Sequence, residues 1–218
     1  MLDYLQRDLG ENPAFTVIWL HGLGADGHDF EPIVPELNLP PASSVRFIFP
    51  HAPEQAVTIN GGMVMRSWYD ILSMEIARQV DEAGIDQSAE LVKEMVAHEL
   101  DRGISSDHVL LAGFSQGGAI ALHTGLQYDK PLLGILALST YLPLPGRILA
   151  GVNTANQSTP IFMGHGTHDP VVPMLLGRQS CDHLIEQGYS VEWHSYPMQH
   201  SVNMEEIRDV GAWMGRLF

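Results

Sequence analysis

The sequence is poor in cysteine and in basic residues, and each shortage excludes a class of protein. Cys181 is the only cysteine among 218 residues, so the chain forms no internal disulfide and no zinc site built on several cysteines. Lysine and arginine total 11 against 26 aspartates and glutamates, which gives a formal net charge of −15. A chain this acidic repels phosphate backbones and anionic membrane surfaces, which argues against a nucleic-acid-binding protein.

Long apolar runs are also missing, and none reaches the length of a membrane-spanning helix. The first fifteen residues, MLDYLQRDLGENPAF, lack the basic start and apolar core of a secretory signal. A hydrophobic content of 45% with 17% charged residues is typical of a folded globular protein. We therefore expect a cytoplasmic protein without stable membrane insertion, folded as one domain over residues 1–218.

Apolar segments alternate with segments of helical spacing along the chain. Several of the apolar segments are hydrophobic at successive positions, as parallel strands covered on both faces are. The predicted strands span residues 15–20, 45–49, 108–113, 134–139, 160–166 and 190–196. The predicted helices span residues 81–103, 116–126 and 203–218. This alternation predicts an α/β fold with a mostly parallel central sheet and helices on both faces.

Two details of this pattern go beyond the order of the elements. Asn203, with Glu206 three residues later, matches a helix capping box in which Asn replaces the usual Ser or Thr. Residues 50–80 form the one irregular region, and a structureless stretch of this length in a compact domain is more often functional.

The segment GFSQG, residues 113–117, joins a predicted strand to a predicted helix. It fits the pattern G-x-S-x-G of a nucleophile elbow, in which a serine occupies a sharp strand-to-helix turn. Glycine suits positions 113 and 117 because the backbone on either side of the serine approaches itself closely. The turn presents the Ser115 hydroxyl beside the first N–H groups of the helix, which stabilise negative charge. A glycine-rich packing turn is the alternative reading of the pattern alone.

A serine nucleophile requires a base and a third group that orients the base. Asp169 and His200 each follow a predicted strand, in the serine–acid–histidine order of α/β-hydrolases. His165, His168 and His194 are rivals for the base, since the chain has eleven histidines. His165 and His168 with Asp169 also leave a metal site open, although their spacing is weak evidence. Asp169 as a turn residue and His200 as a surface residue are the remaining alternatives.

The tetrahedral intermediate of acyl transfer also needs two hydrogen-bond donors for its oxyanion. The backbone N–H of Gln116, directly after the serine, is one candidate. The segment LHGLG, residues 20–24, follows an early predicted strand and offers the backbone N–H of Leu23 as the second. A flexible turn is the other interpretation of this segment.

Taken with SWYD, LSTYLP, HGTHDPVVP and YPMQH, the segments LHGLG and GFSQGGA make the chain resemble one family from about residue 15 to its end. That family is the small serine carboxylesterase/phospholipase family of α/β-hydrolases, which includes bacterial carboxylesterases and acyl-protein thioesterases. The resemblance implies an α/β-hydrolase fold without a large lid domain, no cofactor, no metal, and hydrolysis of esters or thioesters. By this resemblance Ser115, Asp169 and His200 correspond to the catalytic triad, and Leu23 and Gln116 to the oxyanion hole.

Apolar residues of the irregular region and of the later loops are the candidates for the acyl pocket, with ordinary core packing as the alternative for each. They are Met65, Trp68, Tyr69, Leu142 and Val171. With little chain left for a cap, we expect an open site and a serine carboxylesterase acting on short- to medium-chain esters. An acyl-protein thioesterase, a lysophospholipase and a non-catalytic hydrolase-like binding module are the alternatives. The expected partner is a small-molecule ester or acyl thioester, and both a monomer and a homodimer remain open.

Overall fold

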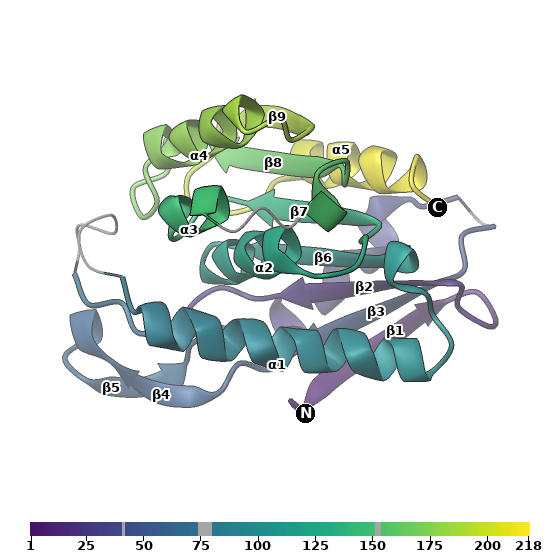
Figure 1. Ribbon diagram of the computed structural model, residues 1–218, viewed down its shortest axis with the longest axis horizontal. Helices are drawn as coiled ribbons and strands as arrows, with labels where there is room; N and C mark the ends of the chain where they lie inside the picture. Colours follow the sequence, from purple (N-terminus) through teal and green to yellow (C-terminus); the bar gives the residue numbers. More distant parts are fainter. Residues whose placement is uncertain (41, 74–79, 151–153) are drawn as a thin grey trace.

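The computed structural model describes residues 1–40, 42–73, 80–150 and 154–218. Among these residues, seven strands form one sheet in the order β1-β3-β2-β6-β7-β8-β9 (Figure 1). The strands are β1 Tyr4–Leu9, β2 Phe15–Leu20, β3 Val45–Pro50, β6 Val109–Phe114, β7 Gly134–Leu138, β8 Ile161–Gly166 and β9 Val191–Tyr196. The neighbours from β3 to β9 are parallel, whereas β1 pairs antiparallel with β3 at the edge. The structure confirms all six predicted strands and adds β1.

Helices cover both faces of this sheet, as the sequence predicts (Figure 1). The helices are α1 Glu82–Asp101, α2 Gln116–Gln127, α3 Pro145–Ala150, α4 Met174–Glu186 and α5 Met204–Gly215. Helices α1, α2 and α4 lie on one face, and α5 lies on the other. No helix in the described ranges is both long enough and apolar enough to span a membrane.

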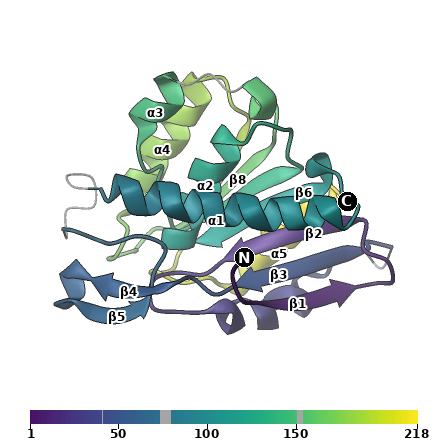
Figure 2. The ribbon, with the colours of Figure 1, turned by 60° about the horizontal axis from the view of Figure 1, so that its bottom comes forward.

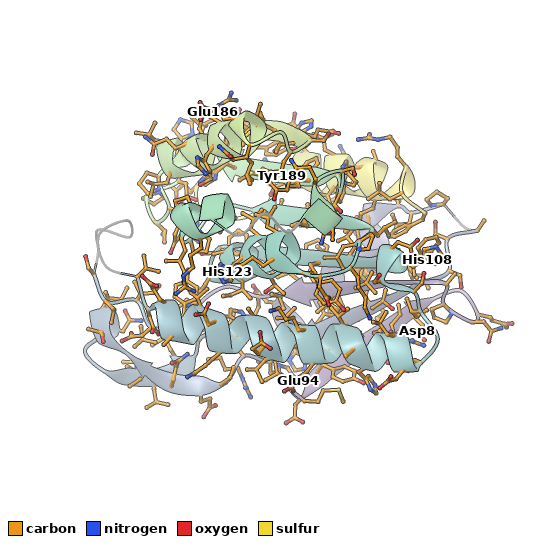
Figure 3. All side chains as sticks on the ribbon, in the orientation of Figure 1. Asp8, Glu94, His108, His123, Glu186 and Tyr189 are labelled. Atoms are coloured by element: carbon orange, nitrogen blue, oxygen red, sulfur yellow. The ribbon has the colours of Figure 1, made fainter. Side chains whose placement is uncertain are left out.

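Successive strand residues divide between the two faces because side chains alternate along a strand. Ile18 of β2 packs in the core under α1 and α2, whereas its neighbour Val17 packs in the core under α5. Both side chains are fully buried, which explains why these strands read as continuous apolar runs. On the first face His123 of α2 lies against α1 (Figure 3), with its Nε2 atom 3.4 Å from Asp86 Oδ1.

The ends of two helices follow their capping residues. Asp81 precedes α1, and its side chain accepts a hydrogen bond from the backbone N–H of Gly84. Asn203 precedes α5 and accepts from the backbone N–H of Glu206 at 2.9 Å. The predicted capping box is therefore only half formed: among the described residues, the Glu206 carboxyl has no hydrogen-bond partner, and it is buried on the sheet side of α5. The Glu206 side chain packs against Gly164 of β8 and does not turn back to the Asn203 N–H, as a complete capping box would require.

The irregular region contains a hairpin that the sequence analysis did not predict. Strands β4 Glu54–Val57 and β5 Met63–Arg66 pair antiparallel, and a short 3₁₀ turn, Thr58–Asn60, connects them. Figure 2 shows this hairpin apart from the main sheet, on the side of β1 and β3. Residues 74–79, which the prediction also includes, lie outside the described part of the chain.

Candidate active site

Ser115 occupies the turn between β6 and α2 with a strained backbone. Its φ of 55° and ψ of −119° lie in a region that residues other than glycine rarely adopt. The turn is held on both sides, because the Ser115 N–H donates to Leu138 O at 2.8 Å and the Thr140 hydroxyl donates to Ser115 O at 2.7 Å. A Cβ atom at Gly113 would overlap the backbone of Gly117, so the close approach predicted for the elbow is present.

The same geometry brings the turn against the neighbouring strand. A Cβ atom at Gly117 would overlap the carbonyl oxygens of Leu20 and His21, which end β2 and begin the loop after it. Leu20 also lies opposite Gly113 in the parallel pairing of β2 with β6. The loop after β2 and the serine turn therefore start side by side.

Ser115, His200 and Asp169 form a continuous chain of hydrogen bonds. The Nε2 atom of His200 lies 2.9 Å from Ser115 Oγ, and its Nδ1 atom lies 2.7 Å from Asp169 Oδ2. A carboxylate only accepts hydrogen bonds, so Nδ1 carries the proton and Nε2 accepts from the hydroxyl. This arrangement lets the imidazole remove the serine proton while the carboxylate fixes its tautomer. The ring of Phe114, which the sequence analysis did not consider, packs against His200 at a centroid distance of 4.8 Å.

Asp169 is held in place by its own loop. Its second oxygen, Oδ1, accepts from the backbone N–H groups of Val171 and Val172 at 2.8 and 2.9 Å. His165 at the end of β8 braces the same loop, because its Nε2–H donates to Val172 O at 2.8 Å. Burial lowers the pKa of His165, so this ring is neutral at neutral pH. His165 therefore stabilises the loop that carries Asp169, a role that its position in the sequence does not indicate.

The two residues predicted to form an oxyanion hole, Leu23 and Gln116, border the cavity that Ser115 lines. Gln116 is the first residue of α2, where backbone N–H groups have no partner within the helix. Among the described residues, neither the Leu23 nor the Gln116 N–H donates to a protein acceptor. Both are available to a ligand oxygen.

A buried set of hydrogen bonds fixes the loop after β2 to the serine turn. The Trp68 indole donates to His21 O at 2.9 Å, and the Trp68 backbone N–H donates to the Gln116 side chain at 2.9 Å. Gln116 Nε2 donates in turn to Tyr69 O at 2.6 Å.

The His21 side chain also holds the loop after β2. Its Nε2 atom accepts from the backbone N–H of Ala52, and its Nδ1–H donates to Gly22 O. Burial lowers the pKa of His21 to about 4, so the ring is neutral and keeps this tautomer.

The hydroxyl of Ser115 opens into a cavity of about 390 Å³, which we call the site cavity. This volume is in the range of small-molecule sites. Its walls combine the serine turn and the loop after β2 with apolar side chains from the end of β6 and from four loops. The apolar side chains are Ile59, Tyr69, Ile71, Phe114, Tyr141, Pro170, Val171 and Val172.

Of the five residues predicted for the acyl pocket, the structure brings Tyr69 and Val171 to the site cavity. The other three lie elsewhere. Trp68 is only 1% exposed and belongs to the core, where its indole donates to His21 O in the loop after β2. Leu142 lines a neighbouring cavity, and the sulfur of Met65 accepts from the Asn60 side chain in the β4–β5 hairpin. Ile59, Ile71 and Tyr141 are wall residues that sequence reasoning missed, since they adjoin the cavity only through tertiary packing.

The rival histidines are engaged away from the serine. His194 stacks on Phe162 at a centroid distance of 4.9 Å, and His168 pairs with the Thr167 hydroxyl at 2.9 Å. Within the ranges that the structure covers, no group of three or more histidine, cysteine or acidic side chains is arranged to hold a metal ion.

Comparison with known proteins agrees with this geometry. Residues 9–215 match the family model described as phospholipase/carboxylesterase. The chain is 42% identical to acyl-protein thioesterase 1 of Neurospora crassa over 201 residues, which cover 88% of this chain and 82% of that protein. It is 39% identical to acyl-protein thioesterase 1 of Yarrowia lipolytica over 204 residues, 91% of this chain and 90% of that one.

Solved structures show the same fold. SOBER1 of Arabidopsis thaliana superposes with a TM-score of 0.88 at 32% identity, covering 93% of this chain and 98% of its own. Acyl-protein thioesterase 2 of Zea mays superposes with a TM-score of 0.87 at 27% identity, covering 100% and 99%. These matches confirm the resemblance seen in the motifs. The chain therefore belongs to the phospholipase/carboxylesterase family of α/β-hydrolases and is a serine hydrolase that acts on ester bonds.

Proposed function

We propose that this protein hydrolyses short- to medium-chain carboxylic esters through an acyl-enzyme on Ser115. The observation that carries the proposal is the hydrogen-bond chain from Ser115 Oγ through His200 to Asp169, whose first two members line the site cavity. Two free backbone N–H groups beside the hydroxyl, those of Leu23 and Gln116, support it further.

In the proposed first step, His200 Nε2 takes the Ser115 proton while Oγ bonds to the acyl carbon. The carbonyl oxygen becomes an oxyanion, and the N–H groups of Leu23 and Gln116 stabilise it. The intermediate then collapses and breaks the bond between the acyl carbon and the leaving oxygen or sulfur. His200 gives its proton to that leaving atom, and the acyl group remains on Ser115. Asp169 stabilises the imidazolium that exists between these two transfers.

In the second step His200 removes a proton from water, and the resulting hydroxide attacks the acyl carbon. Collapse of the second tetrahedral intermediate breaks the bond to Ser115 Oγ. The carboxylic acid leaves, and His200 gives the proton back to the serine. No metal or cofactor is required by any of these proton transfers.

Hydrolysis of acyl thioesters is the second candidate, and the names of the relatives favour it. The curated relatives at 42% and 39% identity are acyl-protein thioesterases. An ester and a thioester of the same acyl group give the same acyl-enzyme on Ser115, because the two substrates differ only in the leaving group. The side of the site that receives the leaving group therefore decides between them.

Labelling with a fluorophosphonate probe tests the proposed nucleophile. The probe is expected to modify the wild-type chain at Ser115 and to leave Ser115→Ala unmodified. Ser115→Ala should also lose ester hydrolysis by a factor of roughly 10³ or more. Labelling at another residue, or ester turnover retained by Ser115→Ala, would overturn the proposal.

The substrate class is tested with matched pairs, the same octanoyl group on an oxygen and on a sulfur leaving group. A higher kcat/KM for the oxygen ester, after correction for the uncatalysed rates of the two compounds, supports the carboxylesterase. A higher corrected value for the thioester establishes the second candidate instead. Ser115→Ala serves as the blank for both compounds.

A further inference from the structure

Tyr141 separates the site cavity from a second cavity. The second cavity has a volume of about 420 Å³, and its walls are mainly apolar. Those walls include Leu142, Pro143, Leu144 and Leu176, with Ser180 and His183 from α4. Among the residues that the structure describes, Tyr141 is the one member common to both linings.

Tyr141 is held at this boundary from both sides. Its hydroxyl lies 2.9 Å from the hydroxyl of Tyr69, so one phenol donates to the other. Burial raises the pKa of both phenols, and both therefore keep the protons that the pair needs. On the other side, the backbone N–H of the next residue, Leu142, donates to the Ser180 hydroxyl of α4 at 2.8 Å. The ring is thus fixed at its tip and at its base.

Tyr69 connects this boundary to the rest of the site. It is 3% exposed, and its carbonyl oxygen accepts from Gln116 Nε2 at 2.6 Å and from the Ser67 hydroxyl at 2.6 Å. The first of these is one of the hydrogen bonds that fix the loop after β2 to the serine turn. The position of the Tyr69 hydroxyl, and through it the position of the Tyr141 ring, is therefore set relative to Ser115.

On the basis of the proposed function, we propose that the Tyr69–Tyr141 pair is the wall that ends the acyl site and sets the longest acyl chain that the enzyme hydrolyses. The apolar side chains on the Ser115 side of the wall receive a short or medium chain. The second cavity lies beyond the wall and offers apolar volume that a longer chain could fill once the ring of Tyr141 is removed.

The test uses p-nitrophenyl acetate, butyrate, octanoate and dodecanoate. With the wild-type protein, kcat/KM is expected to rise by up to about fourfold for each methylene that is buried, and to fall once the chain reaches the wall. Tyr141→Ala is expected to move this maximum to longer chains and to raise the ratio of dodecanoate to butyrate turnover at least tenfold. An unchanged ratio in a variant that still hydrolyses butyrate overturns the wall while leaving the proposed function intact.

A second substitution tests whether the longer chain enters the second cavity. Leu176→Trp fills part of that cavity with a larger side chain and, in the Tyr141→Ala background, is expected to return the ratio to the wild-type value. Leu175→Trp is the matched control, because Leu175 is the preceding residue of α4 and is 63% exposed. Leu175→Trp should leave the raised ratio of Tyr141→Ala as it is. If Leu176→Trp leaves it raised too, the chain takes another path and the assignment of the second cavity is wrong.

Folding and catalysis are controlled separately. Fluorophosphonate labelling of Ser115 reports a competent site in each variant, whatever its chain-length profile. Should Tyr141→Ala not fold, Tyr141→Leu removes the hydroxyl and the outer part of the ring and must shift the maximum in the same direction. Wild-type protein that labels nowhere and hydrolyses none of the four esters refutes the proposed function instead, which keeps the two failures distinct.

Discussion

Glu206 carries a carboxyl group that is fully buried between α5 and the sheet. Within the described part of the chain neither of its oxygens has a hydrogen-bond partner, and its Oε1 fills the space that a Cβ at Gly164 would need. Burial, with a smaller contribution from the charge of Asp209, raises the pKa of Glu206 from 4.5 to about 8. The folded protein thus retains a proton at pH values where the unfolded chain has lost it.

The sign of the effect on stability follows from this difference. Above a pH of 4.5 the unfolded state ionises at Glu206, whereas the folded state holds the proton until the pH reaches about 8. The free energy of unfolding therefore falls as pH rises through this window, by about 1.4 kcal/mol per pH unit from this group. Between pH 5.5 and 7.5 the loss is about 2.5 kcal/mol, and over the whole window it approaches about 5 kcal/mol.

Glu206→Gln removes the titration while keeping the shape of the side chain. The free energy of unfolding of this variant minus that of the wild type is expected to grow by about 2.5 kcal/mol from pH 5.5 to 7.5. Urea denaturation at several pH values, followed by circular dichroism, measures the difference. Glu205→Gln is the control, since Glu205 is the preceding residue of the same helix and is exposed. A difference for Glu206→Gln that stays constant over the pH range would refute the reasoning.

Two further predictions concern the serine turn and its support. Gly117→Ala should lower the free energy of unfolding by about 2 kcal/mol or more, because the new Cβ overlaps Leu20 O and His21 O. Gly146→Ala, whose Cβ would meet no atom within 4 Å, should not destabilise in the same urea titration. Trp68→Phe should lower kcat more than it changes KM, because it frees His21 O and loosens the loop that carries Leu23. A rise in KM alone, seen in steady-state ester hydrolysis, would instead make Trp68 a substrate contact.

The elements that the sequence predicts are those with a strong local signal. Buried parallel strands need apolar residues on both faces, so β2, β6 and β8 read as apolar runs. The strand β1, with the sequence YLQRDL, alternates between half-buried and exposed residues at the sheet edge. Its place depends on pairing with β3 about forty residues away, as Tyr4 opposite Pro50 illustrates. No local pattern specifies such a pairing.

The residues of the site also fall into those that a local pattern predicts and those that only the tertiary structure places. Ser115 is predictable because its turn needs glycine at fixed positions, and Asp169 and His200 because they follow strands in a known order. Trp68 has the same chemistry in a core as in a ligand pocket, and only the tertiary structure, which buries the ring and pairs its indole with His21 O, places it in the core. Glu206 has the sequence position of a capping residue, yet the packing of α5 turns its carboxyl inward.

The order of the strands accounts for the distance between the serine and the acid. Ser115 follows β6 and Asp169 follows β8, and β7 lies between these two strands. Two strand spacings of about 4.8 Å therefore separate their starting points, roughly 10 Å in all. An imidazole with hydrogen bonds of 2.9 and 2.7 Å at its two nitrogens bridges most of that gap. The strand between them, β7, is followed by Tyr141, which lines the wall of the cavity beside the triad.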